Sequence, residues 1–483
     1  MAKKKSLQDP SEFPKTVSAE PNKNFFVHML TRDIELGDAI LDLLDNCVDG
    51  IVRSVGAALP GDKPYARYFA KITLSPTVFM IEDNCGGIPL DLAKTKAFHM
   101  GRPPGHHDSA ATVGMYGIGM KRAIFKIGQQ CKVRSRNGKD AFEVEISKAW
   151  LNQPSNWDLP ISRLDPREIS QAGTSIHISE LRPEVARRFD ENRDAFVKDF
   201  VTFVSQHYSI ILEKGFRVSV NGKAVSPSPF KLLSSAISSS KKGQSVLAPY
   251  VLEATINSVD VKIAVGFYRR IPDEAEIEAE REERASKDDA GWTIVCNDRV
   301  VVYRDKTRLT GWGEAGVPSY HGQFIAITGI VVMHSADLWR LPLTTTKRGI
   351  DPSSDTYSVV KDYMREGIKY FTRFTNRWKK FPDERDKIYK SATLKSLDEV
   401  LRSIPASEKG SVRATSKGIS ASARFVPDLP QPAVDEKEVR ISFSRPKLQV
   451  RTLGHAILDD PDASPADVGA ACFDRMLRKL DLL

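Results

Sequence analysis

Residues 31–55 carry two regular stripes of side chains, and this segment constrains the fold more than any other part of the chain. The apolar stripe recurs at intervals of three and four, which predicts a helix with one buried face. Its members are Ile40, Leu44, Cys47, Ile51 and Val55, and the opposite stripe holds Asp38, Asp42, Asp45, Asn46 and Asp49. Carboxylates on one helix face repel one another by roughly a few tenths of a kcal/mol per pair. The polar stripe is therefore either a solvated face or a site for a divalent cation and a polarised water.

The composition is that of a globular protein with several domains. The chain has 483 residues, of which 41% are hydrophobic and 28% charged, and its net charge of +9 allows an anionic partner. The longest apolar stretch, residues 324–333, is about half of the roughly 20 residues that a membrane-spanning helix needs. No apolar region follows the lysines at the N-terminus, and the five cysteines are scattered. We therefore expect no membrane partner, no secretory signal and a reducing compartment, which is the cytoplasm, or the nucleus in a eukaryote.

Shifts in composition divide the chain into five segments. Residues 1–24 read as a polar arm, and residues 25–190 as a first domain of helices and strands. Residues 191–380 form a second, β-rich domain with a charged insert at about 271–290. Residues 381–439 read as a helix and a Ser/Pro/Lys-rich linker, and residues 440–483 as a C-terminal segment with a short helix.

Three further patterns follow the helix in a fixed order. Asp83 lies at a predicted strand end before Gly86 and Gly87, where a buried carboxylate can accept a hydrogen bond from the exocyclic amine of adenine and reject guanine. The sequence Gly-Met-Tyr-Gly-Ile-Gly-Met-Lys at 114–121 opens a second helix, and glycines before a helix N-terminus expose N–H groups that bind phosphates. Thr174 supplies a hydroxyl at the start of a later strand. Each pattern alone is equally typical of an ordinary turn or loop.

Together the four patterns resemble the boxes of the GHKL ATPases, the superfamily of gyrase, the heat-shock chaperones, histidine kinases and MutL. The resemblance covers about residues 30–180 and implies a Bergerat-type α/β-sandwich that binds ATP and Mg²⁺. It implies that Asn46 holds the metal, that Asp42 is the general base and that Asp83 reads adenine. The other ATP-binding positions that it implies are Gly87, Gly114, Gly117, Gly119, Lys121 and Thr174.

Two positions depart from the family pattern. The base is usually glutamate, so Asp42 implies either a closer helix or slow hydrolysis. Asp45 cannot substitute for it, because three residues place its side chain about 300° around the helix from Asp42. Cys85 stands at the first glycine of the Asp-x-Gly-x-Gly box, whereas Gly87 matches the second.

Similarity to the MORC and MutL branches extends beyond the first domain. The 114–121 segment is similar to the MORC form of the lid, and residues 295–303 look like the Asn-x-Arg strand of an S5-like transducer. Residues 341–351 resemble the transducer loop whose lysine reaches the γ-phosphate, which makes Lys347 a second catalytic candidate, although a surface lysine is the alternative. The predicted fold class is α+β, an α/β-sandwich ATPase domain followed by an S5-like α+β transducer.

The resemblance implies an ATPase, with slow turnover, that forms a homodimer when ATP binds. We expect a clamp or switch that acts on DNA through phosphate contacts in a MORC- or MutL-like way, in defence or genome maintenance. A chaperone-like ATPase that remodels protein clients is the alternative, disfavoured because only about 100 residues follow the transducer. A histidine kinase is less favoured, because no hairpin with a phospho-accepting histidine precedes the ATP site. No Asp-Gln-His-Ala-type nuclease motif is found.

Overall fold

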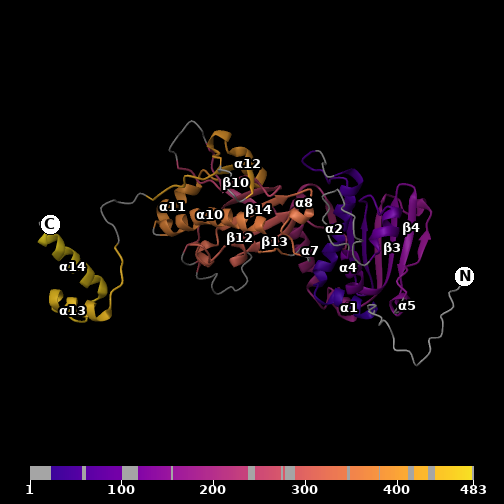
Figure 1. The fold of residues 1–483 in the computed structure, drawn as a ribbon, viewed down its shortest axis with the longest axis horizontal. Helices are drawn as coiled ribbons and strands as arrows, with labels where there is room; N and C mark the ends of the chain where they lie inside the picture. The colour runs from indigo at the N-terminus through magenta and orange to yellow at the C-terminus, as the bar shows by residue number, and fades with distance from the viewer. Residues whose placement is uncertain are drawn as a thin grey trace, which may run out of the picture. The chain divides into compact units, whose positions relative to one another are not determined.

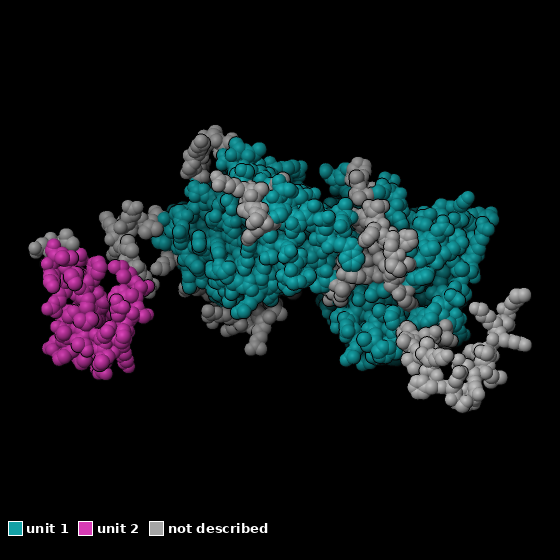
Figure 2. Space-filling model, in the orientation of Figure 1, with its two compact units in different colours: residues 1–432 teal, residues 433–483 magenta. Residues whose placement is uncertain are grey.

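The computed structural model describes most of the chain. The described residues are 23–56, 61–99, 118–153, 156–237, 245–273, 276–277, 289–344, 349–379, 381–411, 418–432 and 441–480. They belong to two compact units, Met1–Pro432 and Ala433–Leu483 (Figure 2). Within the described part of the chain, no helix has the length and apolar character needed to cross a bilayer.

The first unit contains an eight-stranded sheet with the order β5-β4-β3-β6-β2-β1-β7-β8. Its strands are β1 (Phe69–Leu74), β2 (Phe79–Asp83), β3 (Gly128–Asn137), β4 (Asp140–Ile146), β5 (Ile161–Arg163), β6 (Gly173–Leu181), β7 (Arg217–Val220) and β8 (Lys223–Ala224). All neighbouring strands are antiparallel except β1 and β7, which pair in parallel.

Helices cover one side of this sheet and complete an α/β sandwich (Figure 1). They are α1 (Lys23–Arg32), α2 (Leu36–Val55), α4 (Gly119–Ile127), α7 (Phe196–His207) and α8 (Ser209–Glu213). The apolar stripe of α2 lies in the core with alternate residues of the strands, such as Ile72 and Ile81. The predicted helix starting at Thr31 is two helices, because Glu35 is extended and α2 begins after it.

A second, six-stranded sheet in the same unit has the order β13-β12-β14-β11-β10-β16. Its strands are β10 (Tyr250–Ile256), β11 (Val259–Phe267), β12 (Gly291–Cys296), β13 (Arg299–Asp305), β14 (Ile327–His334) and β16 (Ile419–Phe425). The long helix α10 (Asp355–Trp378) packs against β10, β11 and β14 and buries Met364, Ile368 and Phe371 (Figure 1).

Short elements connect these layers. They are α3 (Leu90–Leu92), the π-helical turn η1 (Ala93–Ala97), α5 (Lys148–Leu151), η2 (Pro166–Glu168), α6 (Pro183–Arg188), β9 (Lys231–Ser234), η3 (Arg308–Thr310), η4 (Gly322–Phe324), η5 (Leu338–Arg340), α11 (Pro382–Tyr389), β15 (Thr393–Ser396), α12 (Leu397–Ser403) and η6 (Ala406–Glu408).

The observed elements differ from the expected boundaries in three places. The first sheet continues past residue 190, because β7 and β8 extend it beside β1. Residues 381–439, expected as a helix and a linker, include α11, β15, α12 and β16. β16 pairs with β10 as an edge strand of the second sheet. The second unit holds two helices, α13 (Lys447–Leu458) and α14 (Pro465–Lys479), where one short helix was expected.

Candidate functional site

Asp83, the last residue of β2, lies at the centre of a small hydrogen-bonded cluster. Its Oδ1 accepts the backbone N–H groups of Cys85, at 2.7 Å, and Thr174, at 3.3 Å. Its Oδ2 accepts the thiol of Cys47 from α2, at 3.5 Å. Burial raises the pKa of Asp83 to about 6, although these hydrogen bonds oppose that rise. The carboxyl group thus connects α2 to two strands of the sheet.

The backbone after Asp83 makes a turn that only glycine allows. Gly86 and Gly87 have φ values of +93° and +70°. A Cβ at Gly87 would lie 2.1 Å from the carbonyl oxygen of Arg136, so no side chain fits there. Cys85, which replaces the first family glycine, is buried and directs its thiol toward the Phe69 carbonyl, at 3.8 Å. The family glycine that Cys85 replaces is therefore not needed for the tight turn, because Gly86 and Gly87 make it.

Thr174 lies beside Asp83 and is joined to a second hydroxyl. Its Oγ1 is 3.2 Å from Oγ of Ser135, which accepts the N–H of Ile88 at 2.7 Å and lies 3.2 Å from the carbonyl oxygen of Gly173. Ser135 is fully buried in β3. Sequence analysis did not find it, because a single serine in a strand carries no signal of its own.

Asp42 of α2 forms an ion pair with Arg122 of α4. The distance from Nη2 to Oδ2 is 2.6 Å, and the two side chains are only 12% and 7% exposed for Arg122 and Asp42. A Cβ at Gly119 would lie 3.2 Å from Cγ of Asp42, so the small residue lets the start of α4 approach α2. Arg122 was not predicted, because its partner lies 80 positions away in the sequence.

Asn46 lies one turn beyond Asp42 on α2. Its Nδ2 is buried and has no hydrogen-bond partner among the described residues, and the same is true of Nε of Arg122. An amide can turn either its NH₂ group or its oxygen toward a ligand. Mg²⁺ in nucleotide sites is commonly held by one or two protein oxygens together with the substrate phosphates. The unpaired NH₂ group can donate to a phosphate oxygen, and a turn of the amide would present its oxygen to Mg²⁺.

Lys121 of α4, which was predicted to bind ATP, contacts the chain at the end of η1 in this structure. Its Nζ donates to the carbonyl oxygen of Ala97, at 2.9 Å, and burial lowers the pKa of the ammonium group to about 8. It thus ties α4 to η1 in this structure. The predicted residues Gly114, Gly117 and Lys347 lie outside the described residues.

The polar stripe of α2 is not a solvated face. Each of its aspartates is at most 8% exposed: Asp38, Asp42, Asp45 and Asp49. Asp45 accepts a hydrogen bond from Nε of Arg299 in β13, at 3.0 Å, whereas Asp42 pairs with Arg122 of α4. The stripe therefore serves at least two separate sets of contacts.

One part of the chain matches a known family. Residues 34–178 match the sequence model described as histidine kinase-, DNA gyrase B- and HSP90-like ATPase. Residues 34–178 form a GHKL-type ATPase domain. This confirms the predicted superfamily and its α/β-sandwich, and it supports ATP binding and hydrolysis at the superfamily level. A search of curated proteins found no match.

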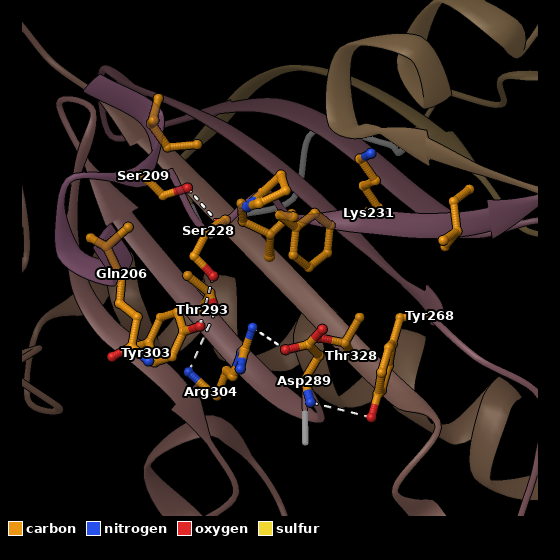
Figure 3. A pocket seen from close by; sticks show the side chains of 16 residues that line it. Gln206, Ser209, Ser228, Lys231, Tyr268, Asp289, Thr293, Tyr303, Arg304 and Thr328 are labelled. Carbon is orange, nitrogen blue, oxygen red and sulfur yellow. Dashed lines mark hydrogen bonds and ion pairs between the residues drawn. The ribbon is translucent and has the colours of Figure 1, made fainter. Parts of the chain in front are cut away.

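A cavity of about 310 Å³ is lined in part by residues of the second sheet (Figure 3). Tyr303 and Arg304 of β13 and Gln206 of α7 line it, and Arg304 forms an ion pair with Asp289. None of Asp42, Asn46, Asp83 or Thr174 contributes to its wall. The cavity is therefore separate from the predicted nucleotide site.

Proposed function

We propose that this protein binds Mg·ATP between α2, α4 and the β2–β6 end of the first sheet, and hydrolyses it there. The observation that carries the proposal is the convergence of distant motifs on α2. Asp83 contacts α2 through Cys47, whose neighbour Asn46 has an unpaired amide, and Gly119 abuts Asp42. Residues that are far apart in the sequence thus lie around one face of α2, which supports a single nucleotide site.

Each residue has a defined part in the proposed reaction. Asp83 accepts a hydrogen bond from the adenine amine, and Thr174 holds Asp83 in place. The N–H group of Gly119 at the start of α4 receives a phosphate oxygen, and we assign the same role to Gly114 and Gly117 by their match to the lid motif. Asn46 would hold Mg²⁺ together with the phosphates, and the ion would supply positive charge that offsets the phosphate charge. Asp42 orients a water and takes its proton as the water bonds to the γ-phosphorus and ADP leaves. Lys347 stabilises the charge that develops on the γ-phosphoryl group.

Arg122 bears directly on the proposed base. Its ion pair fixes the position of the Asp42 carboxylate, but it also occupies Oδ2. An attacking water must therefore use the other oxygen or displace Arg122, which is consistent with slow turnover. The unpaired Nε of Arg122 offers a donor to a phosphate oxygen.

We further propose that ATP closes two copies of the chain into a homodimeric clamp on DNA, in a MORC- or MutL-like way. The net charge of +9 supports an anionic partner, and the second sheet and its Asn-x-Arg strand support a transducer. Defence or genome maintenance is the corresponding biological setting. An ATPase that remodels protein clients is the second candidate, since the matched family includes HSP90-like members.

Light scattering combined with an ATPase assay tests both levels of the proposal. We expect phosphate release that stops when a chelator removes the metal, and a doubling of mass with a non-hydrolysable ATP analogue. Adding DNA to the analogue-bound protein should increase the mass further. A protein without ATP-dependent mass change would contradict the clamp, and one without ATP binding would contradict the site itself.

A further inference from the structure

The turn between β12 and β13 lies against the ATPase domain. Asn297 and Asp298 adopt left-handed φ values of 45° and 67°, which makes the turn tight. Arg299, the first residue of β13, then reaches α2. We propose that Arg299 is a positioning residue for ATP hydrolysis, which holds Asp45 and thereby the adjacent Asn46. This inference rests on the proposed ATPase function.

Arg299 and Asp45 form an ion pair that is almost completely buried. Their side chains are 4% and 2% exposed. Tyr208 donates its hydroxyl to the same Oδ1 of Asp45, at 2.5 Å, and burial raises the pKa of this phenol, so it keeps its proton. The guanidinium also stacks 4.8 Å from the centre of the Tyr208 ring. The position of Asp45 is thus set from the second sheet and from the start of α8.

Two backbone carbonyls also hold the guanidinium of Arg299. Nη1 donates to the carbonyl oxygens of His207, at 3.1 Å, and Val300, at 3.0 Å. Burial lowers the pKa of His207 to about 4, and the charge of Arg299 adds to that effect. The imidazole is therefore neutral at pH 7, and its Nδ1 lies 2.9 Å from the Val300 carbonyl oxygen. The cluster consequently contains one cation and one anion, held in a single arrangement.

A buried ion pair of this kind contributes little net free energy to the stability of the fold. Removing two charges from water costs about as much as their attraction returns, and apolar residues of similar size often serve equally well. A charged pair instead specifies direction, because each hydrogen bond tolerates little displacement. Asp45 immediately precedes Asn46, so a shift of α2 at Asp45 moves the metal ligand as well. The ion pair therefore makes the geometry of the metal ligand depend on the β12–β13 turn.

A neighbouring ion pair provides a matched control. Lys214, at the end of α8, contacts both carboxylate oxygens of Asp298, at 2.6 and 2.7 Å. Tyr65 donates to the same carboxylate at 3.4 Å, and His334 lies 3.4 Å from it. This pair ties the same turn to the same domain without touching α2. Losing Lys214 should therefore weaken the contact but leave Asn46 in place.

The test compares Arg299→Met with Lys214→Met in the full chain. For Arg299→Met we expect turnover to fall about 10- to 100-fold, because small misplacements in a catalytic site have effects of this size. We expect its Mg²⁺ requirement to rise, while ATP affinity without metal stays the same. Lys214→Met should match the wild type in turnover, in Mg²⁺ requirement and in ATP affinity. If Arg299→Met does not fold, Arg299→Lys provides the test, because lysine keeps the charge but not the forked geometry. Its turnover should be slow as well.

A second readout is independent of turnover. Amide hydrogen exchange in α2 should quicken in Arg299→Met and not in Lys214→Met. Two results would overturn the positioning role. One is an equal loss of turnover in Arg299→Met and Lys214→Met, and the other is normal turnover in the double variant Asp45→Leu/Arg299→Met. Either result would mean that any contact between the two domains is enough for activity. A wild type that does not bind ATP would overturn the proposed function, and the exchange comparison would still decide whether Arg299 positions α2.

Discussion

The carboxyl group of Asp83 has a higher proton affinity than that of a surface aspartate. Burial raises its pKa to about 6, so near neutral pH it is mostly ionised but close to titration. The folded protein retains this proton up to about pH 6, whereas an unfolded chain loses it near pH 4. Ionised Asp83 therefore lowers the stability of the fold as the pH rises through this range. The group is kept at a cost in stability, which is typical of a functional site.

Adenine recognition by Asp83 gives the first prediction. Asp83→Asn should abolish measurable ATP binding, because the amide loses a charge-assisted hydrogen bond worth about 1–3 kcal/mol and can turn its NH₂ toward the adenine amine. In the wild type, ATP affinity should weaken as the pH falls through about 6, since protonation removes the same charge. Calorimetric titration at several pH values measures both effects. Unchanged affinity in the variant would remove Asp83 from the site.

The second prediction concerns the proposed base. Asp42→Asn should preserve ATP binding and slow turnover by about 10²–10⁴-fold, the usual contribution of a positioned base. The variant should accumulate as an ATP-bound dimer. Steady-state phosphate release and light scattering measure the two effects. Wild-type turnover in Asp42→Asn would mean that the ion pair with Arg122 is structural only.

The elements show which parts of the site follow from local sequence. The spacing of apolar residues predicts α2, and the glycine-rich segment 114–121 predicts that a helix follows it. The order of the boxes predicts that Asp42, Asn46, Asp83 and Thr174 belong to one site. The burial of the acid stripe could not be predicted, because the arginine partner of Asp45 is 254 positions away. An acidic helix face has the same pattern whether water or arginine covers it.

The boundary of the first domain was unpredictable for a similar reason. β7 has only four residues, and it pairs in parallel with β1, so nothing in its neighbourhood identifies its partner. β16 reads Ile-Ser-Ala-Ser-Ala-Arg-Phe, which lacks a strong apolar alternation, yet it pairs with β10 along most of its length. Strand pairing over long distances overrides weak local preference in both cases.

This boundary gives the third prediction. A fragment ending at residue 190 lacks α7 and β7, and it leaves one edge of β1 unpaired. Val218 and Val220 are at most 3% exposed, and burying a valine contributes about 1.5 kcal/mol or more. A fragment ending at residue 226 should therefore unfold cooperatively at a higher temperature and bind ATP. Calorimetry of the two fragments measures this, and equal stability would show that β7 is dispensable.

At the scale of the whole molecule, the last prediction separates the two candidate functions. A DNA clamp must gather the net charge of +9 into a basic surface. Binding by phosphate neutralisation releases counterions, so affinity should fall about 10³-fold or more between roughly 50 and 200 mM salt for six or more contacts. Filter binding or fluorescence anisotropy at several salt concentrations measures this slope.

Closure of the ATP-bound dimer around DNA should also give a result that electrostatic binding alone cannot produce. With the ATP analogue bound, circular DNA should remain trapped at a salt concentration that strips linear DNA, because topology retains the circle. An ATPase that remodels protein clients would show neither behaviour and would instead suppress aggregation of an unfolded protein when ATP is present. If DNA binding is absent at about 50 mM salt with the analogue bound, where phosphate contacts are strong, the clamp is excluded and protein clients become the favoured substrate.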